Sequence, residues 1–351
     1  MKENRKFTKI LVTGGSGFIG SNFIHNFITN NPSSKVINID LLSYAGNEEN
    51  NKNLSSKNYL HIKGDICSKD AVINIFKNYE VDAVINFAAE SHVDRSINDP
   101  YIFIHSNIIG TYNLLECIKE YKEHFGKEIL FHHISTDEVY GSLTMDDSSF
   151  TEAHKYYPNS PYSASKAASD HIVRAWHKTF GLPVTISNCS NNYGPFQYPE
   201  KLIPLTIFNA INGKNIELYG NGLNIRDWLY VKDHCDAIEK IIKNGEYGET
   251  YNIGGNNEIN NIEIVENICK KLEDVFPCKS NFKSKFNSYF DSIKFVNDRP
   301  GHDFRYAIDS TKIKRDLGWY PNETFESGIV KTINWYIKNE KWLNSAFIKN
   351  V

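Results

Sequence analysis

The sequence predicts an α/β fold built on a doubly wound parallel sheet, followed by a smaller C-terminal α/β domain that binds substrate. Two observations support this. Through the first half of the chain, short β-branched runs alternate with longer segments of helical period. Several runs, such as "AVINFAA", are apolar at nearly every position, which is typical of strands buried on both faces. This order favours a parallel sheet covered by helices on both sides, with right-handed crossovers.

The expected elements follow in chain order. In the first half we expect strands at residues 9–14, 35–40, 59–65, 82–89, 128–135 and 183–190, and helices at 17–30, 68–79, 100–124 and 161–180. In the second half we expect a strand-like stretch within 218–233 after an Asn-Gly turn, and helices at 200–211, 232–243, 262–275, 310–317 and 324–339. Residues 1–190 then form the first domain, which the chain re-enters at about 226–254, and residues 191–351 mainly form the second.

The composition excludes several classes of protein. The 351 residues carry a formal net charge of −3, which gives no electrostatic reason to expect nucleic acid or an anionic membrane as a partner. No run approaches the roughly 20 apolar residues that a membrane span needs. The six cysteines are scattered without a C-x-x-C pair or a Cys/His cluster, so we expect no metal site. Reduced thiols and the absence of a leader-like segment favour a cytoplasmic protein.

A glycine-rich turn follows the first expected strand. In "VTGGSGFIGSNF", Gly14, Gly17 and Gly20 stand three residues apart where a helix is expected to begin. Backbone without Cβ atoms approaches a pyrophosphate closely, and a helix N-terminus offers free N–H donors. Asp40 ends the second strand, where a carboxylate accepts both ribose hydroxyls of NAD and repels the 2′-phosphate of NADP. Together these features predict a Rossmann-type NAD site rather than a turn without a ligand.

The rest of the glycine motif and the next two strand ends extend this cofactor site. Residues that follow the third strand are expected beside the adenine, and residues that follow the fourth strand near the inner ribose and the nicotinamide. Each of these strand ends would be unremarkable alone. The residues assigned in this way are Phe18, Ile19, Asp65, Ile66, Phe87, Ala88, Ala89 and Ser91.

A tyrosine and a lysine stand four residues apart in the expected helix at 161–180. In "SPYSASKAASDH", Tyr162 and Lys166 therefore share one helix face. An ammonium close to a phenol favours the phenolate and lowers the tyrosine pKa toward working pH. Such a pair is common on helix surfaces. With an NAD site upstream and Thr136 at the end of the preceding strand, however, Tyr162 is a candidate base for a sugar or alcohol hydroxyl.

Two adjacent acids, Asp137 and Glu138, follow Thr136 in "STDEVYG". Ligands of parallel sheets bind beyond the carboxyl ends of the strands, so both acids are expected in the same cleft as Tyr162. Simple dehydrogenation does not need them. One acid, kept protonated by its neighbour and by burial, can donate a proton, while the other, ionised, can accept one. The alternative is that one or both acids cap a helix or face water.

Motifs along nearly the whole chain, from about residue 8 to residue 338, resemble one family. That family is the dTDP-glucose 4,6-dehydratases of the extended short-chain dehydrogenase/reductase superfamily. The adjacent acids distinguish it from 4-epimerase relatives, which lack them. The motifs that are similar are "GGSGFIGSNF", "NFAAESHVDRSI", "STDEVYG", "SPYSASKAASDH", "NCSNNYGPFQYPEKLIP", "YGNGLNIRDWLYVKDH", "ETYNIGG" and "DRPGHDFRYAID".

The resemblance implies a reaction cycle. Tyr162, assisted by Lys166, takes the proton of the sugar 4-hydroxyl while hydride passes from C4 to NAD. Glu138 then removes the C5 proton, and Asp137 protonates the departing C6 hydroxyl. Hydride returns to C6, so NAD stays tightly bound and is regenerated in each turnover. Water is lost more easily beside a transient ketone than from an unactivated sugar, which agrees with this cycle.

The resemblance also implies binding residues and a homodimer that forms through the helices near 100–124 and 161–180. Thr136 is expected to hydrogen-bond the sugar 4-oxygen and Ser91 to lie close to it, with Ser106 and Asn192 beside the cofactor. Guanidinium groups suit a diphosphate because they make paired, charge-assisted bonds. The positions that match the nucleotide-binding residues of the family are Asn191, Glu200, Lys201, Leu202, Tyr219, Arg226, Asn261, Arg299 and His302.

Several alternatives stay open from the sequence. A UDP-glucose 4,6-dehydratase or a nucleotide-sugar 4-epimerase would use the same Tyr162 and Lys166, and a catalytically silent NAD-sensing protein would share the fold. The sequence does not distinguish thymine from uracil in the substrate, because one methyl group changes binding by only about 1–3 kcal/mol. The lysine- and asparagine-rich loop at 277–290 matches the family least closely.

Overall fold

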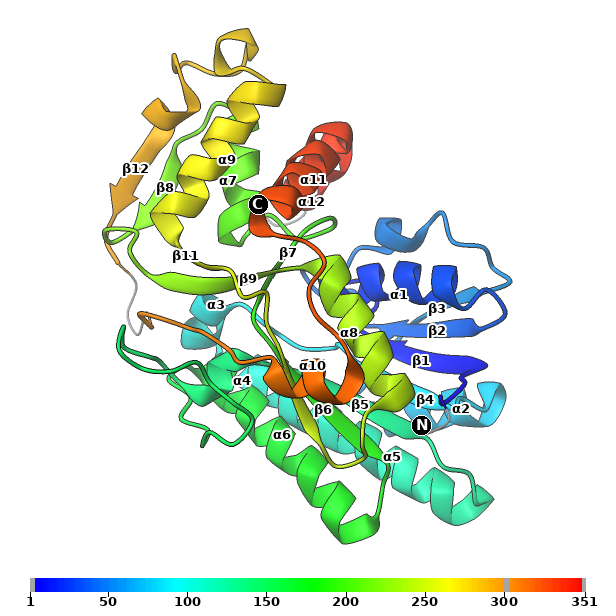
Figure 1. Cartoon of the computed structure of the whole chain (residues 1–351). Helices are drawn as coiled ribbons and strands as arrows, with labels where there is room; N and C mark the ends of the chain where they lie inside the picture. Colours follow the sequence, from blue (N-terminus) through cyan, green and yellow to red (C-terminus); the bar gives the residue numbers. More distant parts are fainter. Residues whose placement is uncertain (1–3, 299–302, 349–351) are drawn as a thin grey trace.

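A seven-stranded sheet, in which every neighbouring pair of strands is parallel, forms the larger part of the molecule (Figure 1). The computed structural model describes residues 4–298 and 303–348. The strand order, β10-β6-β5-β4-β1-β2-β3, winds outward in both directions from β1, which confirms the predicted doubly wound sheet. The strands are β1 (Lys9–Thr13), β2 (Lys35–Asp40), β3 (Tyr59–Lys63), β4 (Ala83–Asn86), β5 (Leu130–Thr136), β6 (Val184–Cys189) and β10 (Thr250–Ile253).

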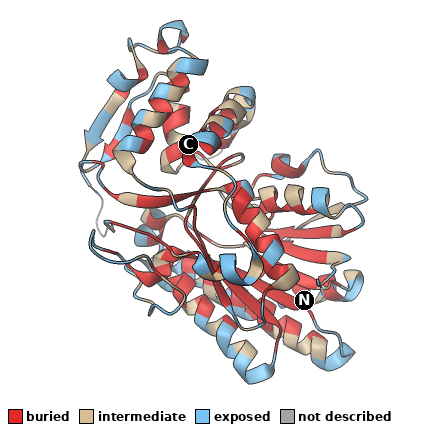
Figure 2. Ribbon diagram, in the orientation of Figure 1, coloured by how far each residue is buried: buried red, intermediate tan, exposed pale blue. Residues whose placement is uncertain are grey.

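Helices cover both faces of this sheet, and the strands between them are buried (Figure 2). On one face, α1 (Phe18–Asn30) and α8 (Val231–Asn244) pack against strand residues such as Ile10. On the other face, α2 (Lys69–Tyr79), α5 (Gly110–Phe125) and α6 (Pro161–Phe180) pack against residues such as Leu11. Successive strand residues point to opposite faces, so apolar runs without alternation are what this layering requires.

The boundaries of α6 agree with the sequence prediction and have a local cause. The side chain of Ser160 accepts from the backbone N–H of Ser163 and the Ser163 side chain accepts from that of Ser160, which closes a capping box. Pro161 occupies the first helical turn, and Gly181, with φ of 64°, ends the helix in the left-handed conformation. These caps fix where Tyr162 and Lys166 lie relative to the sheet.

The helix expected at 100–124 is not one regular α-helix, so that prediction is wrong in part. The chain forms α4 (Pro100–Phe103), a π-helical segment (Ile104–Ile109) and α5, preceded by α3 (Val93–Asn98), which the sequence did not predict. Asn107 lies in the wide π-helical turn, and its side chain bonds both backbone groups of Glu90 at 2.8 and 3.0 Å and Ser165 Oγ at 2.8 Å. The turn therefore ties the loop after β4 to α6. Such turns are frequent at functional sites.

The second half of the chain builds a separate core from two small sheets and several helices. The strands β11 (Glu258–Asn260), β9 (Ile225–Tyr230) and β7 (Asn191–Tyr193) form one sheet, and β12 (Ile293–Val296) pairs with β8 (Ile216–Tyr219). The helices are α7 (Leu202–Ile211), α9 (Asn261–Val275), α11 (Phe325–Lys338) and α12 (Glu340–Ile348), and they share one hydrophobic core with these strands.

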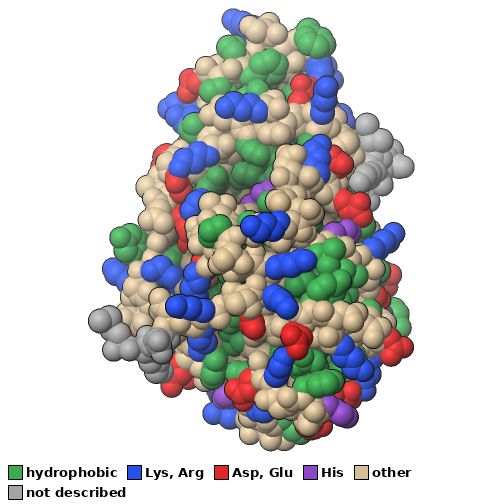
Figure 3. All heavy atoms as spheres, turned by 90° about the vertical axis from the view of Figure 1, so that its right-hand side faces the viewer, with side chains coloured by type: hydrophobic (Ala, Val, Ile, Leu, Met, Phe, Trp, Pro, Cys, Tyr) green, Lys and Arg blue, Asp and Glu red, His purple; other side chains and the backbone are tan. Residues whose placement is uncertain are grey.

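Between these small strands, the chain returns to the large sheet. Helix α8 lies over it, β10 pairs with β6 with Thr250 opposite Ile186, and α10 (Thr311–Leu317) packs beside β10. Among the described residues no helix is long and apolar enough to cross a bilayer. The face of the molecule in Figure 3 carries basic and acidic side chains interspersed with hydrophobic ones.

Candidate active site

A cavity of about 840 Å³ opens where the parallel strands end, and residues of both halves of the chain line it. Every predicted site residue that the structure describes lies on its wall; Arg299 and His302 lie outside the described residues. The residues predicted to bind cofactor that line it are Gly14, Gly17, Phe18, Ile19, Gly20, Asp40, Asp65, Ile66, Phe87, Ala88, Ala89, Ser91, Ser106, Tyr162, Lys166 and Asn192. The remaining ones are Thr136, Asp137, Glu138, Asn191, Glu200, Lys201, Leu202, Tyr219, Arg226 and Asn261.

The glycine-rich turn has the shape of a phosphate cradle. Gly14 has a positive φ of 67°, and a Cβ there would lie 2.7 Å from Ala88 Cα. A Cβ on Gly20 would lie 2.5 Å from the Gly14 carbonyl oxygen, so α1 packs onto the turn only without a side chain. Gly17 is the N-cap of α1 and supplies no side chain to its first N–H groups. Those donors line the cavity and fit an anionic phosphate.

Asp40 is fixed at the end of β2 beside this turn. Its Oδ2 accepts the Ser16 backbone N–H and its Oδ1 that of Leu42, both at 2.8 Å. Burial raises the pKa of the Asp40 carboxyl, while these two hydrogen bonds oppose the shift. Each carboxylate oxygen keeps a second lone pair, so the group can also accept ribose hydroxyls. The residues present therefore fit a dinucleotide with a free 2′-hydroxyl.

The end of β5 places three predicted residues in the cavity. Thr136 is the last residue of the strand, and its Oγ1 accepts the Glu138 backbone N–H at 3.3 Å, which starts the 3₁₀ turn Asp137–Tyr140. The register of β5 with β6 puts Cys189 opposite Thr136. Asp137 is buried at 1% exposure, and Glu138 is half-buried. Both acids line the cavity with Tyr162 instead of facing bulk water.

Asp137 occupies an environment that favours its neutral form. Burial, together with the charges of Glu138 and Asp227, raises the pKa of the Asp137 carboxyl well above its ordinary value, and Arg226 only partly opposes this. Thr136 Oγ1 donates to Asp137 Oδ1 at 3.4 Å, while Oδ2 has no hydrogen bond among the described residues. A buried carboxylic acid with an unused oxygen is suited to donate a proton to a ligand.

Tyr162 and Lys166 both line the cavity, but no hydrogen bond joins them in the part of the chain that the structure describes. The Lys166 ammonium donates to the Ile134 carbonyl oxygen at 2.7 Å, and burial lowers its pKa to about 8. Burial, with the charge of Glu138, raises the pKa of Tyr162 well above its ordinary value. The expected lowering of the tyrosine pKa is therefore wrong, because desolvation is the largest influence on it and the charge of Glu138 acts in the same direction.

Hydrogen bonds between loops join several residues of the cavity wall. The Tyr44 hydroxyl donates to Glu200 Oε1 at 3.0 Å, and Lys201 Nζ donates to the Ser91 carbonyl oxygen at 3.1 Å. The Arg226 guanidinium donates to the carbonyl oxygens of Ile225, Asp303 and Phe304 and lies over the ring of Tyr306. Backbone carbonyls therefore hold Arg226, which sequence reasoning expected to meet either a diphosphate or an ion-pair partner.

Sequence reasoning missed several residues of the cavity wall. Tyr44 and Arg95 are examples, and the Arg95 guanidinium lies 3.7 Å from the centre of the Tyr44 ring. Nothing in their sequence neighbourhoods signals this contact, because it joins two loops that the fold alone brings together. Tyr306 could have been predicted as a wall residue, since it lies in the motif "DRPGHDFRYAID". The other wall residues missed in this way include Ser43, Glu90, His92, Cys189, Gln197, Tyr198 and Trp228.

Comparison with known proteins first gives the class. The family model described as GDP-mannose 4,6 dehydratase matches residues 11–332. That match covers the glycine-rich turn, the strand ends and most of the second core. The chain is therefore of the nucleotide-sugar dehydratase class of short-chain dehydrogenase fold.

Individual relatives give the family. The dTDP-glucose 4,6-dehydratase of Salmonella typhimurium is 52% identical over 351 residues, covering 96% of this chain and 95% of that protein. The dTDP-glucose 4,6-dehydratase of Streptomyces venezuelae, solved with NAD bound, superposes with a TM-score of 0.87 at 40% identity and covers 96% of this chain and 99% of that one. The dTDP-glucose 4,6-dehydratase of Bacillus anthracis, in complex with NAD, superposes with a TM-score of 0.84 at 46% identity. That comparison covers 97% of this chain and 99% of the other. The chain belongs to the dTDP-glucose 4,6-dehydratase family.

The environment of Asp137 predicts a stability gain on its removal. Because the folded pKa of this acid is raised, ionisation costs stability as pH rises from the unfolded pKa toward the folded one. Asp137→Asn should therefore unfold at a higher urea concentration than the parent. Its gain in the free energy of unfolding should grow by about 1.4 kcal/mol per pH unit within that window. Denaturation at about pH 5 and about pH 8 should show the larger gain at the higher pH. Asp146→Asn, at an exposed position, is the control; an equal gain there would contradict the account.

Proposed function

We propose that this chain converts dTDP-glucose to dTDP-4-keto-6-deoxyglucose by oxidation at C4, loss of water across C5 and C6, and return of hydride to C6. The observation that carries the proposal is the convergence of Asp137 and Glu138 with Tyr162 in one cavity that also contains the dinucleotide cradle. A 4-epimerase or a simple dehydrogenase has no use for two extra acids beside the tyrosine. A sugar that must lose water needs both a proton acceptor and a proton donor.

NAD supplies the reversible hydride acceptor of this chemistry when it is bound. We propose that the Gly14–Gly20 turn and the start of α1 hold its pyrophosphate, that Asp40 holds the adenosine ribose, and that Asp65 and Ile66 border the adenine. The residues after β4, with Ser106 and Asn192, would hold the nicotinamide half. The cavity geometry described above supports this assignment.

Each protein group has a distinct role in the proposed reaction. Tyr162 accepts the proton of the 4-hydroxyl as the phenolate, the form that the positive charge of Lys166 favours, and Thr136 hydrogen-bonds the 4-oxygen. Glu138 accepts the C5 proton, which the adjacent ketone makes acidic. Asp137, neutral because it is buried, donates a proton to the departing C6 hydroxyl. Asp137 is buried more deeply than Glu138, which supports giving Asp137 the role of proton donor.

The second core is proposed to bind the nucleotide, with residues 1–190 and about 226–254 forming the cofactor domain. Asn191, Glu200, Lys201, Leu202, Tyr219, Arg226 and Asn261 line that end of the cavity, which supports the proposal. Arg299 and His302 are proposed to contact the nucleotide from the segment outside the described residues.

We also propose a cytoplasmic homodimer. The outer surfaces of α4, the π-helical segment, α5 and α6 carry large hydrophobic side chains that are well exposed, with Tyr101 at 71%. Several exposed apolar side chains on one group of helices are typical of a subunit interface. A second copy of this face would cover it with the same helices. The exposed side chains are Tyr101, Ile104, Ile109, Tyr112 and Phe180.

The decisive experiment for the activity uses purified protein without added cofactor. Incubation with dTDP-glucose should yield the 4-keto-6-deoxy product, detected by its strong absorbance in alkali and by mass spectrometry as loss of water. UDP-glucose, tested separately, measures the preference for the base. A galactose nucleotide would instead identify an epimerase, and no turnover with either substrate would contradict the proposal.

Glu138→Gln separates the proposed oxidation from the elimination. The amide cannot accept the C5 proton, so bound NAD should still be reduced in a single turnover while release of water falls by about 10²-fold or more. Absorbance of NADH and mass spectrometry of the product measure the two steps. Glu128→Gln, at an exposed position, should change neither step. Dehydration at the parent rate in Glu138→Gln would show that another group is the base.

The proposed interface predicts the effect of a charge. Tyr112→Glu puts a carboxylate on the exposed face of α5, where pairing of two copies would bury two like charges. The variant should have half the solution mass of the parent by light scattering. Tyr320→Glu, at an exposed position away from these helices, should keep the parent mass. A parent protein that is already monomeric would exclude the interface.

A further inference from the structure

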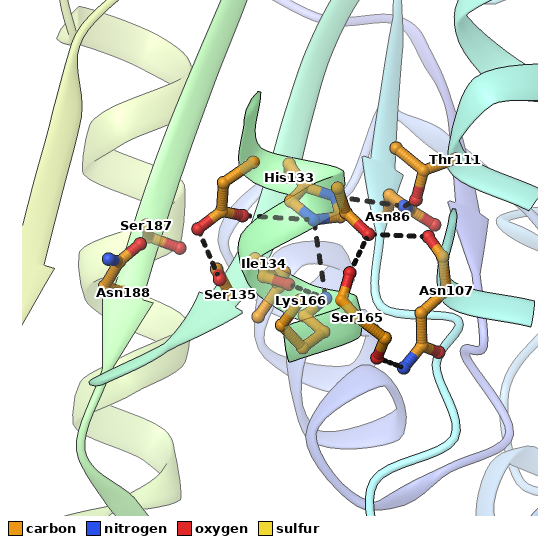
Figure 4. A network of polar contacts seen from close by, with 12 residues as sticks. Asn86, Asn107, Thr111, His133, Ile134, Ser135, Ser165, Lys166, Ser187 and Asn188 are labelled. Carbon is orange, nitrogen blue, oxygen red and sulfur yellow. Dashed lines mark hydrogen bonds and ion pairs between the residues drawn. The ribbon is translucent and has the colours of Figure 1, made fainter. Parts of the chain in front are cut away.

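A buried polar network surrounds the predicted catalytic lysine (Figure 4). Strand β4 supplies Asn86, strand β5 supplies His133 and Ser135, and helix α6 supplies Lys166 and Asp170. His133 and Asp170 have no exposed surface. Neither residue contacts the cavity, so the proposed reaction steps leave this network without a role.

The alternation of β5 explains how the network forms. Phe131, His133 and Ser135 point toward α6, whereas His132 and Ile134 point to the face covered by α8. On α6, Tyr162, Lys166 and Asp170 succeed one another at spacings of four residues and therefore share one face. Asp170 is thus one helical turn beyond the lysine, just as the lysine is one turn beyond the tyrosine.

The hydrogen bonds define the state of His133. Asn86 Oδ1 accepts from Thr13 Oγ1 at 2.6 Å, so the Asn86 amide nitrogen faces His133 Nδ1, at 3.1 Å. That nitrogen can only donate, which makes Nδ1 the acceptor and leaves the proton on Nε2. Nε2 lies 3.5 Å from Asp170 Oδ1, which has no hydrogen bond among the described residues. His133 is therefore a neutral imidazole whose Nε2 lies near Asp170 without a hydrogen bond to it.

The lysine lies against the same histidine. Its Nζ is 3.4 Å from His133 Nε2, a nitrogen that already carries a proton, so the imidazole gives the ammonium no compensating charge. The positive charge of Lys166 in turn helps to keep the pKa of His133 well below its ordinary value. A fully buried ammonium is costly unless an opposite charge lies nearby. Among the described residues the Asp170 carboxylate is the largest influence that favours the charged form of Lys166.

We propose that Asp170, held by Ser135, is a positioning residue that keeps the Lys166 ammonium charged and fixed behind Tyr162. Ser135 Oγ donates to Asp170 Oδ2 at 2.8 Å, and His133 Nε2 lies 3.5 Å from the other oxygen, between the carboxylate and Lys166 Nζ. The inference rests on the proposed function, because the charge of Lys166 matters only if Tyr162 accepts a substrate proton.

Other titratable groups around this pair do not replace it. Cys189 of β6 also faces Lys166, but burial raises its pKa to about 12, so the thiol is neutral. Asp170 is faced by Tyr156 from the loop before α6 and by Arg174 one turn further along α6. Burial raises the pKa of Asp170 to about 6, below the value of about 8 for Lys166. Both groups are therefore charged between those two values, which includes neutral pH.

The test compares Asp170→Asn with the parent at the level of the lysine and of the reaction. Without the carboxylate, burial is uncompensated and Lys166 should lose its proton at lower pH by at least about one unit, which is a tenfold change in the charged fraction. The pH dependence of amine labelling at Lys166, followed by mass spectrometry in the free protein, measures this directly. The rate of single-turnover reduction of bound NAD by dTDP-glucose should also change with pH. The pH at which lysine deprotonation alters this rate should be correspondingly lower in the variant.

Two further variants keep the test decisive. Ser135→Ala removes one hydrogen bond to Asp170 without removing its charge, and it should shift both profiles in the same direction by a smaller amount. Asp233→Asn, at a buried acid on α8 that accepts the Glu323 backbone N–H, should leave both profiles in place even if it lowers stability.

Unshifted labelling and rate profiles in Asp170→Asn, or in Ser135→Ala if the first variant does not fold, would overturn the inference. If the parent reduces no NAD, the proposed function fails, while the labelling profiles still test the link between Asp170 and Lys166.

Discussion

The cost of burying charge governs this site. At the end of β5, a carboxyl, a phenol and an ammonium all lie almost completely out of water, and burial is the largest influence on the pKa of each. A buried ionisable group either becomes neutral or acquires a partner. Burial favours the neutral forms of Asp137 and Tyr162, whereas we propose that the Asp170 carboxylate keeps Lys166 charged. The site therefore holds proton donors and acceptors whose pKa values would return to their ordinary range in bulk water.

Strand β5 connects these groups to the fold. Its alternate side chains enter the network behind Lys166, and its last residue caps the turn that carries the two acids into the cavity. The sheet buries the strand on both faces, so neither set of contacts can relax toward solvent. One strand thus determines both the supporting side and the reactive side of the site. The π-helical turn at Asn107 adds a second anchor, through Ser165 of α6.

Much of this arrangement was predictable from the sequence, since it depends on local rules. Apolar runs and helical periodicity predicted the large sheet and α6, and the spacing of Tyr162 and Lys166 predicted that they share one helix face. Asp170 continues that spacing and was overlooked, because a buried acid at a third helical turn has no local signature apart from its interval. The direction of the Tyr162 pKa shift depends on burial by distant segments. The short strands β7, β11 and β12 and the interrupted helix at 100–124 also depend on tertiary contacts.

The central claim is that one cavity removes a hydride from C4 and returns the same hydride to C6, with water lost in between. The most direct measurement is turnover of dTDP-glucose carrying deuterium at C4, with the product examined by NMR and mass spectrometry. The account predicts deuterium at C6 of the 4-keto product and a hydrogen from solvent at C5. Deuterium that is lost to solvent, or that remains at C4, would contradict it.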